Sequence, residues 1–198
     1  MKQKEDDLFS DALVTAFDMP PFISRMKPNT DKVNLFMRTW NINPDDVFYD
    51  IRQDRVVFPV YHNGTLVDAV GRSVFQRQPK WLRYAASPIP YMHGEGDIMV
   101  VVEDAISAYT VGEMFPHVVG VALLGTQLTE FHKWFFSKYY TYNNFIIALD
   151  HDAFVKTLKI IKELRPHVSN VRGLKLGDDL KYLRDNDVQS LKEMLNAC

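Results

Sequence analysis

Cysteine is nearly absent from this chain of 198 residues, because Cys198 at the last position is its only one. A single cysteine excludes an internal disulfide framework and a cysteine-based zinc site within the chain. Long apolar runs are missing as well, since the longest, Ile98–Val102, is far shorter than the roughly 20 residues that span a membrane. We therefore expect a cytoplasmic protein with no membrane segment and no zinc.

The chain also lacks a strong excess of charge of one sign, because its formal net charge is only -2. Such a balance excludes a basic nucleic-acid coat, so nucleic-acid contacts must come from a local patch or from bound metal ions. No Gly-x-x-x-x-Gly-Lys-Ser/Thr loop is present, which argues against a P-loop helicase module. Hydrophobic residues make up 46% of the chain, enough to predict a well-packed core.

The first part of the chain combines helical patterns with a β-hairpin. Helices are expected over residues 8–17 and 31–40, the second capped by Thr30 or Asp31. Strands are expected over residues 56–61 and 66–71. Asn63-Gly64 lies between them, and Asn-Gly is the strongest short signal for a hairpin. We interpret residues 1–96 as an N-terminal subdomain that contacts nucleic acid or nucleotide.

From Asp97 onward, apolar strands alternate with helices. Strands are predicted over residues 98–102, 118–124, 145–149 and 168–176. Helices are predicted over residues 105–115, 129–139, 153–164, 178–185 and 188–195. Strands separated by helices of this length imply βαβ units and a mostly parallel sheet. The predicted fold class is α+β, with residues 97–198 forming a metal-binding α/β domain.

Acidic side chains follow two of these strands. Glu103 comes directly after residues 98–102, whereas Asp150 and Asp152 come after residues 145–149. Open parallel sheets bind ligands beyond the carboxyl ends of their strands. In an extended chain Asp150 and Asp152 would project to one face and His151 to the other. The alternative is that these acids are solvated loop residues, or that Asp152 caps the following helix.

Gathered carboxylates need a compensating charge. Two unit charges about 4 Å apart repel by about 1 kcal/mol in water and about 4 kcal/mol at an effective dielectric constant of 20. A hard divalent cation such as Mg²⁺ reverses the sign of that energy and can organise phosphoryl transfer. Gly125 ends the intervening strand, where its backbone could approach a phosphate. The acids therefore predict a magnesium site.

Three segments carry a family resemblance: Val100–Ala105, Ala122–Thr126 and Ile147–Asp152. Their order resembles the TOPRIM domain of topoisomerases, primases and some nucleases, in which strands end in glutamate, in glycine and in Asp-x-Asp. Upstream, Arg55–Val60, Asn63-Gly64, Gly71-Arg72 and Pro79–Leu82 resemble bacterial and phage primases. Together the motifs resemble the catalytic core of a phage-type DNA primase.

This resemblance implies Mg²⁺-dependent, or Mn²⁺-dependent, synthesis of short RNA primers from ribonucleoside triphosphates on a single-stranded DNA template. It would occur in the host cytoplasm if the chain is phage-encoded. The implied metal ligands and catalytic residues are Glu103, Asp150 and Asp152, with Asp179 as a further ligand. Arg72 and Lys80 would contact template or nucleotide phosphate. The zinc domain and helicase of such systems would be separate polypeptides, or would have been cut away.

Several positions depart from the primase pattern. Many primases have glycine at the position of Asp104, aspartate at Ser107 and a second late acid at Lys181. Lys181 leaves fewer metal ligands, so a non-catalytic nucleic-acid or replisome-binding module with a decayed site is one alternative. A metal-dependent TOPRIM nuclease with the same acids is another, although the primase-like stretch Arg55–Leu82 argues against it.

Overall fold

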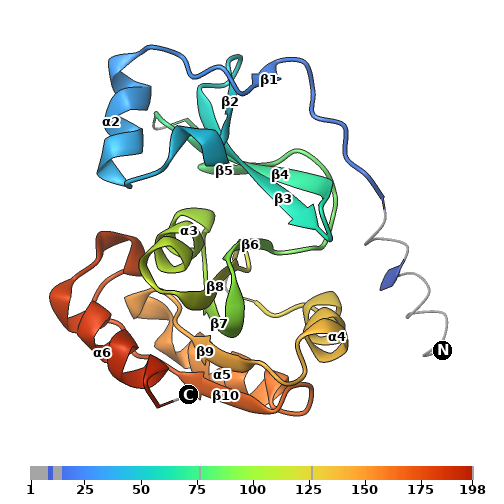
Figure 1. Ribbon diagram of the computed structural model, residues 1–198, viewed down its shortest axis with the longest axis vertical. Coiled ribbons are helices and arrows are strands. Elements are labelled where there is room, and N and C mark those ends of the chain that lie inside the picture. Colours follow the sequence, from blue (N-terminus) through green and yellow to red (C-terminus); the bar gives the residue numbers. More distant parts are fainter. Residues whose placement is uncertain (1–8, 11–14, 76, 126, 198) are drawn as a thin grey trace. The chain divides into compact units, whose positions relative to one another are not determined.

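The computed structural model describes residues 9–10, 15–75, 77–125 and 127–197 (Figure 1). The chain divides into two compact units, Met1–Tyr91 and Met92–Cys198. The division into domains 1–96 and 97–198, with the roles assigned to them from the sequence, remains a prediction. Of the helix predicted over residues 8–17, Phe9 and Ser10 are helical and Thr15–Phe17 are not, while residues 8 and 11–14 lie outside the described residues. Cys198 and Thr126 lie outside them too.

The first unit contains an antiparallel sheet in the order β1-β2-β3-β4-β5. Its strands are β1 (Ile23–Ser24), β2 (Phe48–Asp50), β3 (Arg55–His62), β4 (Thr65–Ser73) and β5 (Trp81–Arg83). The predicted hairpin is confirmed, because β3 pairs with β4 across Asn63 and Gly64. Both turn residues have positive φ, 48° and 77°, as a tight hairpin of this kind requires.

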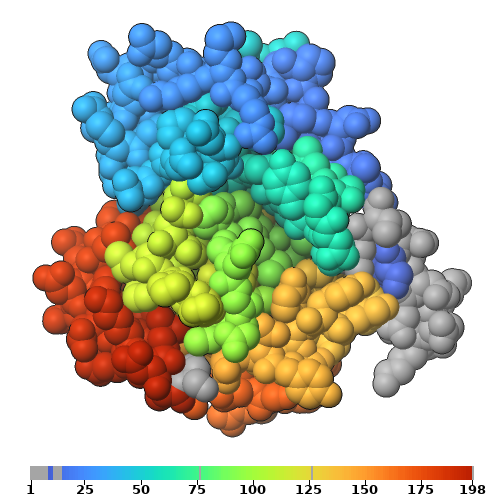
Figure 2. Space-filling model, in the orientation of Figure 1, coloured from blue at the N-terminus to red at the C-terminus, as the bar shows by residue number. Residues whose placement is uncertain are grey.

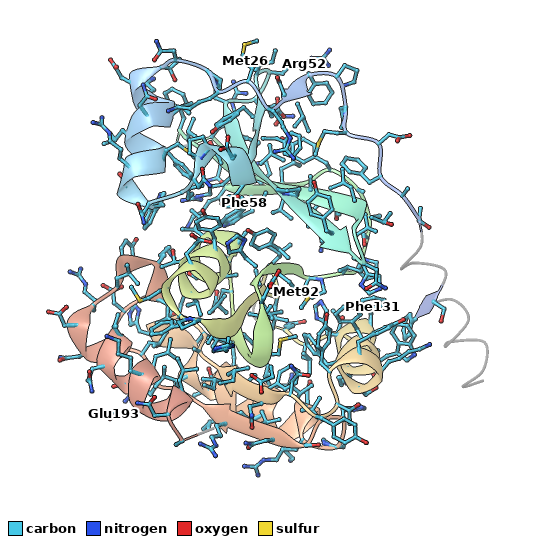
Figure 3. All side chains as sticks on the ribbon, in the orientation of Figure 1. Met26, Arg52, Phe58, Met92, Phe131 and Glu193 are labelled. Atoms are coloured by element: carbon cyan, nitrogen blue, oxygen red, sulfur yellow. The ribbon has the colours of Figure 1, made fainter. Side chains whose placement is uncertain are left out.

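Helical elements and aromatic packing complete this unit. The helix α2 (Asp31–Thr39) begins at Thr30, whose hydroxyl accepts a hydrogen bond from the amide of Val33, and the 3-10 turn η1 (Pro44–Asp46) follows. Phe58 of β3, labelled in Figure 3, is fully buried. Its ring contacts those of Trp81 and Tyr91, with centroids 6.1 and 5.5 Å away. This packing holds β5 against the hairpin.

The second sheet has the order β10-β9-β7-β8-β6, and its β7–β8, β7–β9 and β9–β10 pairings are parallel. The strands are β6 (Tyr91–Gly94), β7 (Gly96–Val102), β8 (His117–Ala122), β9 (Asn144–Ile147) and β10 (Asn170–Gly173). The helices are α3 (Ala105–Met114), α4 (Glu130–Tyr139), α5 (Phe154–Leu164) and α6 (Asp185–Leu195), with 3-10 turns η2 (His151–Ala153) and η3 (Leu180–Tyr182). The predicted fold class and the alternation of strand and helix are confirmed.

One predicted helix is wrong. Residues 178–185 form only η3 before α6 begins at Asp185, because Leu183 adopts the left-handed conformation, with φ of 51°. A non-glycine residue in that conformation ends a helix. Residues 178 and 179 are thereby left in a loop near the carboxyl ends of the strands.

Close packing fixes α3 on β7 and β8 (Figure 1). A Cβ atom at Gly120 would lie only 1.9 Å from the carbonyl oxygen of Ala108, so glycine permits this approach of helix and strand. Figure 2 shows α6, in red, on the surface of this unit, and Glu193 is on its exposed face (Figure 3). Among the described residues, no helix has both the length and the apolar character needed to cross a bilayer.

Candidate active site

Glu103 directly follows β7, and its side chain is half-buried at the carboxyl end of that strand. Its Oε1 atom is buried and has no hydrogen-bond partner among the described residues. Burial raises the pKa of Glu103, and the ammonium of Lys156 partly opposes this rise. The carboxylates of Asp152 and Asp179 raise the pKa further. A buried carboxylate oxygen without a partner is costly unless it is protonated or a cation approaches it.

Asp150 lies beyond the end of the neighbouring strand β9 and is also half-buried. Burial raises its pKa to about 7, against the opposing effect of the Lys181 ammonium. The carboxylates of Glu103 and Asp179 add to the rise, since like charges disfavour ionisation. The two strand-end acids therefore lie close enough to repel each other, as their positions in the parallel sheet predicted.

Asp152 and His151 occupy η2, not an extended segment. The expectation of an extended segment is therefore wrong, and Nδ1 of His151 lies 4.0 Å from Oδ1 of Asp179. Asp152 is exposed, and the N-cap of α5 is Ala153, with no side-chain hydrogen bond at that cap. Asp152 is thus not the cap of α5 that the alternative interpretation required.

A buried acid that the sequence analysis missed holds the loop of residues 177–179. Asp187, in the first turn of α6, accepts hydrogen bonds from the amides of Gly177 (2.7 Å) and Asp178 (3.0 Å). Asp178 in turn pairs with Arg184 and accepts the amide of Asp179. The only sequence signal was the position of Asp187 at a helix start, where acids are common.

Lys181 joins this loop to the start of α3. Its buried ammonium lies 3.1 Å from Oδ2 of Asp104 and also bonds Oδ2 of Asp179. Asp104 is the N-cap of α3, where its Oδ1 accepts the amide of Ser107. Burial alone would lower the pKa of Lys181, but the carboxylates of Asp104 and Asp179 raise it above its usual value. The acid of the primase pattern is therefore replaced by a buried cation.

The fit of a divalent cation can be judged from these contacts. Glu103, Asp150 and Asp152 have no hydrogen bond or ion pair from side chains in the described parts of the chain, and Oε1 of Glu103 is buried. In the same parts, their ligand atoms do not all lie within 4.8 Å of one another, whereas those of His151, Asp178 and Asp179 do. Carboxylate oxygens suit Mg²⁺. The buried, partnerless oxygen of Glu103 fits a cation.

Gly125, the predicted phosphate contact, is exposed in the turn after β8. A Cβ atom there would meet nothing within 4 Å, so packing does not require glycine at this position. Its role toward phosphate stays a prediction.

The two predicted phosphate-binding residues of the first unit line one groove of about 720 Å³. Arg72 lies at the end of β4 with its guanidinium 5.4 Å from the centre of the Trp81 ring, and Lys80 is exposed just before β5. Other cationic and aromatic residues share the groove, among them Lys32, Arg77, Trp40 and Phe75. Cations interleaved with aromatic rings suit the phosphates and bases of single-stranded nucleic acid.

The buried Arg55 shapes the rim of this groove. Its guanidinium donates hydrogen bonds to the carbonyl oxygens of Pro79 (2.8 Å), Gly71 (3.2 Å) and Lys80 (3.4 Å). A Cβ atom at Gly71 would lie 2.9 Å from the Tyr84 ring and 3.1 Å from the Arg55 side chain, so glycine makes room for both. Arg55 thereby holds the backbone that carries Lys80.

Comparison with solved structures places this architecture among DNA primase catalytic cores. The Aquifex aeolicus primase, with its zinc-binding and RNA polymerase domains, is 17% identical, with a TM-score of 0.61 over 98% of this chain and 56% of that one. A primase domain from Pseudomonas aeruginosa is 18% identical, with a TM-score of 0.55 over 83% and 60%.

The primase fragment of the bacteriophage T7 primase-helicase is 16% identical, with a TM-score of 0.52 over 73% of this chain and 68% of that fragment. The chain spans about three-fifths of the bacterial cores that it matches. No family model and no curated protein matches it in sequence. At these identities the comparisons show that the chain has the primase-core fold.

Proposed function

We propose that this chain is the polymerising core of a DNA primase of the phage type, which makes short RNA primers on single-stranded DNA. The observation that carries the proposal is the buried, partnerless oxygen of Glu103 beside the half-buried Asp150. Both acids lie at the carboxyl ends of adjacent parallel strands, in a fold shared with primase cores. The acids would thus form a TOPRIM-like site in which a divalent cation compensates their negative charge.

Glu103, Asp150 and Asp152 would hold Mg²⁺ or Mn²⁺, with Asp179 beside them. When bound, such an ion supplies positive charge that stabilises the attacking and leaving oxygens of phosphoryl transfer. In the proposed reaction the 3′-hydroxyl of a primer attacks the α-phosphate of a ribonucleoside triphosphate, and pyrophosphate leaves. Glu103 would act as a ligand or as the group that exchanges a proton with a reacting oxygen, a role that its raised pKa suits.

Arg72 and Lys80 would bind template or nucleotide phosphate in the groove of the first unit, and Gly125 would approach phosphate in the second. Among the structural neighbours, one DnaG catalytic domain is bound to single-stranded DNA, and T7 primase domains are bound to an RNA/DNA hybrid. Others include a zinc-binding domain or come from a primase-helicase. A zinc-domain or helicase polypeptide is accordingly a proposed partner.

The test is extension of a pre-annealed RNA primer on single-stranded DNA with ribonucleotides and Mg²⁺ or Mn²⁺. A pre-made primer removes initiation, the step that a separate zinc domain would assist. We expect extension by the unmodified chain and its loss in the double variant Asp150→Asn, Asp152→Asn. Equal extension by both proteins would refute the proposal, and metal-dependent shortening of the template would indicate the nuclease alternative.

One observation favours a second candidate, a non-catalytic module that binds nucleic acid or a replication partner. Lys181 pairs with Asp104 and Asp179, so part of the acidic cluster is already neutralised. The same assay separates the candidates. A chain that binds the primer–template but neither extends nor degrades it, with Mg²⁺ or with Mn²⁺, would be such a module.

A further inference from the structure

The side chain of Lys181 is one of the most enclosed charges in the second unit, with 5% of its area exposed. An ammonium has three hydrogen-bond donors. Two of the contacts made here go to carboxylates, Oδ2 of Asp104 at 3.1 Å and Oδ2 of Asp179. A buried ammonium persists only when it is paired in this way. Lys181 is therefore a fixed component of the acidic cluster.

The contacts of Asp104 engage both of its carboxylate oxygens. Its Oδ2 receives the ammonium, and its Oδ1 receives the amide of Ser107 at the start of α3. Asp104 is 8% exposed. Its carboxylate acts as a helix cap and as an ion-pair partner.

The group formed by His151, Asp178 and Asp179 is neutralised by cations of the chain as well. Asp178 pairs with Arg184 at 3.0 Å and accepts the amide of Asp179. Asp179 pairs with Lys181. A divalent cation placed on Asp179 would stand next to the Lys181 ammonium, and like charges at that separation repel.

Glu103, Asp150 and Asp152 differ from these acids. Within the described residues, none of the three has an ion pair, and Oε1 of Glu103 has no hydrogen bond. The cluster is thus divided into acids that pair directly with a cation of the chain and acids that do not.

We propose that the Lys181 ammonium is a resident cation that takes the place of a divalent ion between Asp104 and Asp179, and so confines divalent cations to Glu103, Asp150 and Asp152. The inference rests on the metal-binding part of the proposed function. It gives Asp179 a different role from the one predicted, because Asp179 then holds the internal cation. It follows that the site takes fewer divalent ions than its number of acids suggests.

The experiment is titration of the full chain with Mn²⁺ alone, followed by electron paramagnetic resonance of the free ion. We expect the unmodified chain to bind one Mn²⁺ tightly. Lys181→Met should bind additional Mn²⁺, because the carboxylates of Asp104 and Asp179 are released. Lys181→Arg keeps the charge and should bind as the unmodified chain does. Lys159→Met, which removes an exposed lysine of α5, is the matched control and should change nothing.

A second variant keeps the inference testable if Lys181→Met does not fold. Asp179→Asn should change the dissociation constant of the tightly bound Mn²⁺ by less than about tenfold, whereas loss of a true ligand costs more than that. A larger loss in Asp179→Asn overturns the inference, as does unchanged Mn²⁺ stoichiometry in folded Lys181→Met.

The double variant Asp150→Asn, Asp152→Asn separates this inference from the proposed function. If the double variant loses the Mn²⁺ that the unmodified chain binds, the proposed metal site is supported. The Lys181 variants alone then decide the inference. If the unmodified chain binds no Mn²⁺, or the double variant binds it equally well, the metal site of the proposed function fails, and the inference is overturned with it.

Discussion

The ammonium of Lys181 lies 3.1 Å from a carboxylate oxygen of Asp104, although 77 positions separate the two residues in the chain. The contact ties η3 to the N-cap residue of α3, and the same ammonium holds Asp179, the residue directly before η3. A buried charge pair is costly to break, because removal of one partner leaves the other without compensation. The pair therefore links the folding stability of this unit to its acidic cluster.

Replacement of Lys181 by methionine should destabilise the metal-free protein by about 3 kcal/mol, because Asp104 and Asp179 lose their cation in a buried site. Lys181→Arg should cost less, since it keeps the charge. Urea unfolding in the presence of a chelator measures both. A Lys181→Met variant as stable as the unmodified chain would show that the ion pairs contribute nothing to the fold.

The stability of the metal-free protein should depend on Asp150. Its pKa of about 7 in the folded chain lies above the ordinary carboxyl value of 3.8. A group with a raised folded pKa stabilises the fold fully below its unfolded pKa, and this contribution is lost as the pH rises through the folded pKa. The free energy of unfolding should therefore fall between about pH 4 and pH 7.

The check is urea unfolding across this range in a chelator, for the unmodified chain and for Asp150→Asn. The variant should show a weaker decline, because its amide does not titrate. Added Mg²⁺ should offset the decline at pH 7, since a cation favours the ionised carboxylate. The same decline in both proteins would assign the pH dependence to other groups.

Asp187→Ala should loosen the loop that carries Asp179, because the amides of Gly177 and Asp178 lose their acceptor. We expect a loss of about 2 kcal/mol in unfolding free energy. Asp185→Ala is the matched control, since Asp185 is an exposed acid in the same helical turn with the same effect on the helix dipole. Equal losses of unfolding free energy in the two variants would mean that the hydrogen bonds that Asp187 accepts from the loop do not stabilise the fold.

Arg72→Ala and Lys80→Ala should each weaken binding of a fluorescent single-stranded oligonucleotide and lower the slope of log affinity against log salt by about 1. Lys162→Ala, on the exposed side of α5, is the control for a general change of charge. Fluorescence anisotropy at several salt concentrations gives the slopes. If the slope is unchanged in both groove variants, the groove does not bind the template strand.

Local signals explain what the sequence predicted well. Asn63-Gly64 imposes a turn on its own, and the buried strands β7 and β9 appear as apolar runs because both their faces are covered. Since parallel strands end at one edge of a sheet, the proximity of Glu103 and Asp150 also followed from the pattern.

Non-local contacts explain what the sequence could not show. Nothing near Lys181 indicates that Asp104 will receive its ammonium, because that contact depends on how η3 folds back against α3. The prediction of an extended segment over residues 150–152 is wrong for a related reason. The segment after β9 was taken as extended, but a bond from the amide of Ala153 to the carbonyl of Asp150 turns it into η2.

The most direct test of the central claim, that the strand-end acids bind a divalent cation, is the Mn²⁺ affinity of Glu103→Gln. This change keeps the size of the side chain and removes the charge at the buried, partnerless oxygen. Glu193→Gln, on the exposed face of α6, is the control. We predict that Glu103→Gln raises the dissociation constant of Mn²⁺ by more than about tenfold while Glu193→Gln does not. Equal affinity in both variants and the unmodified chain would contradict the account.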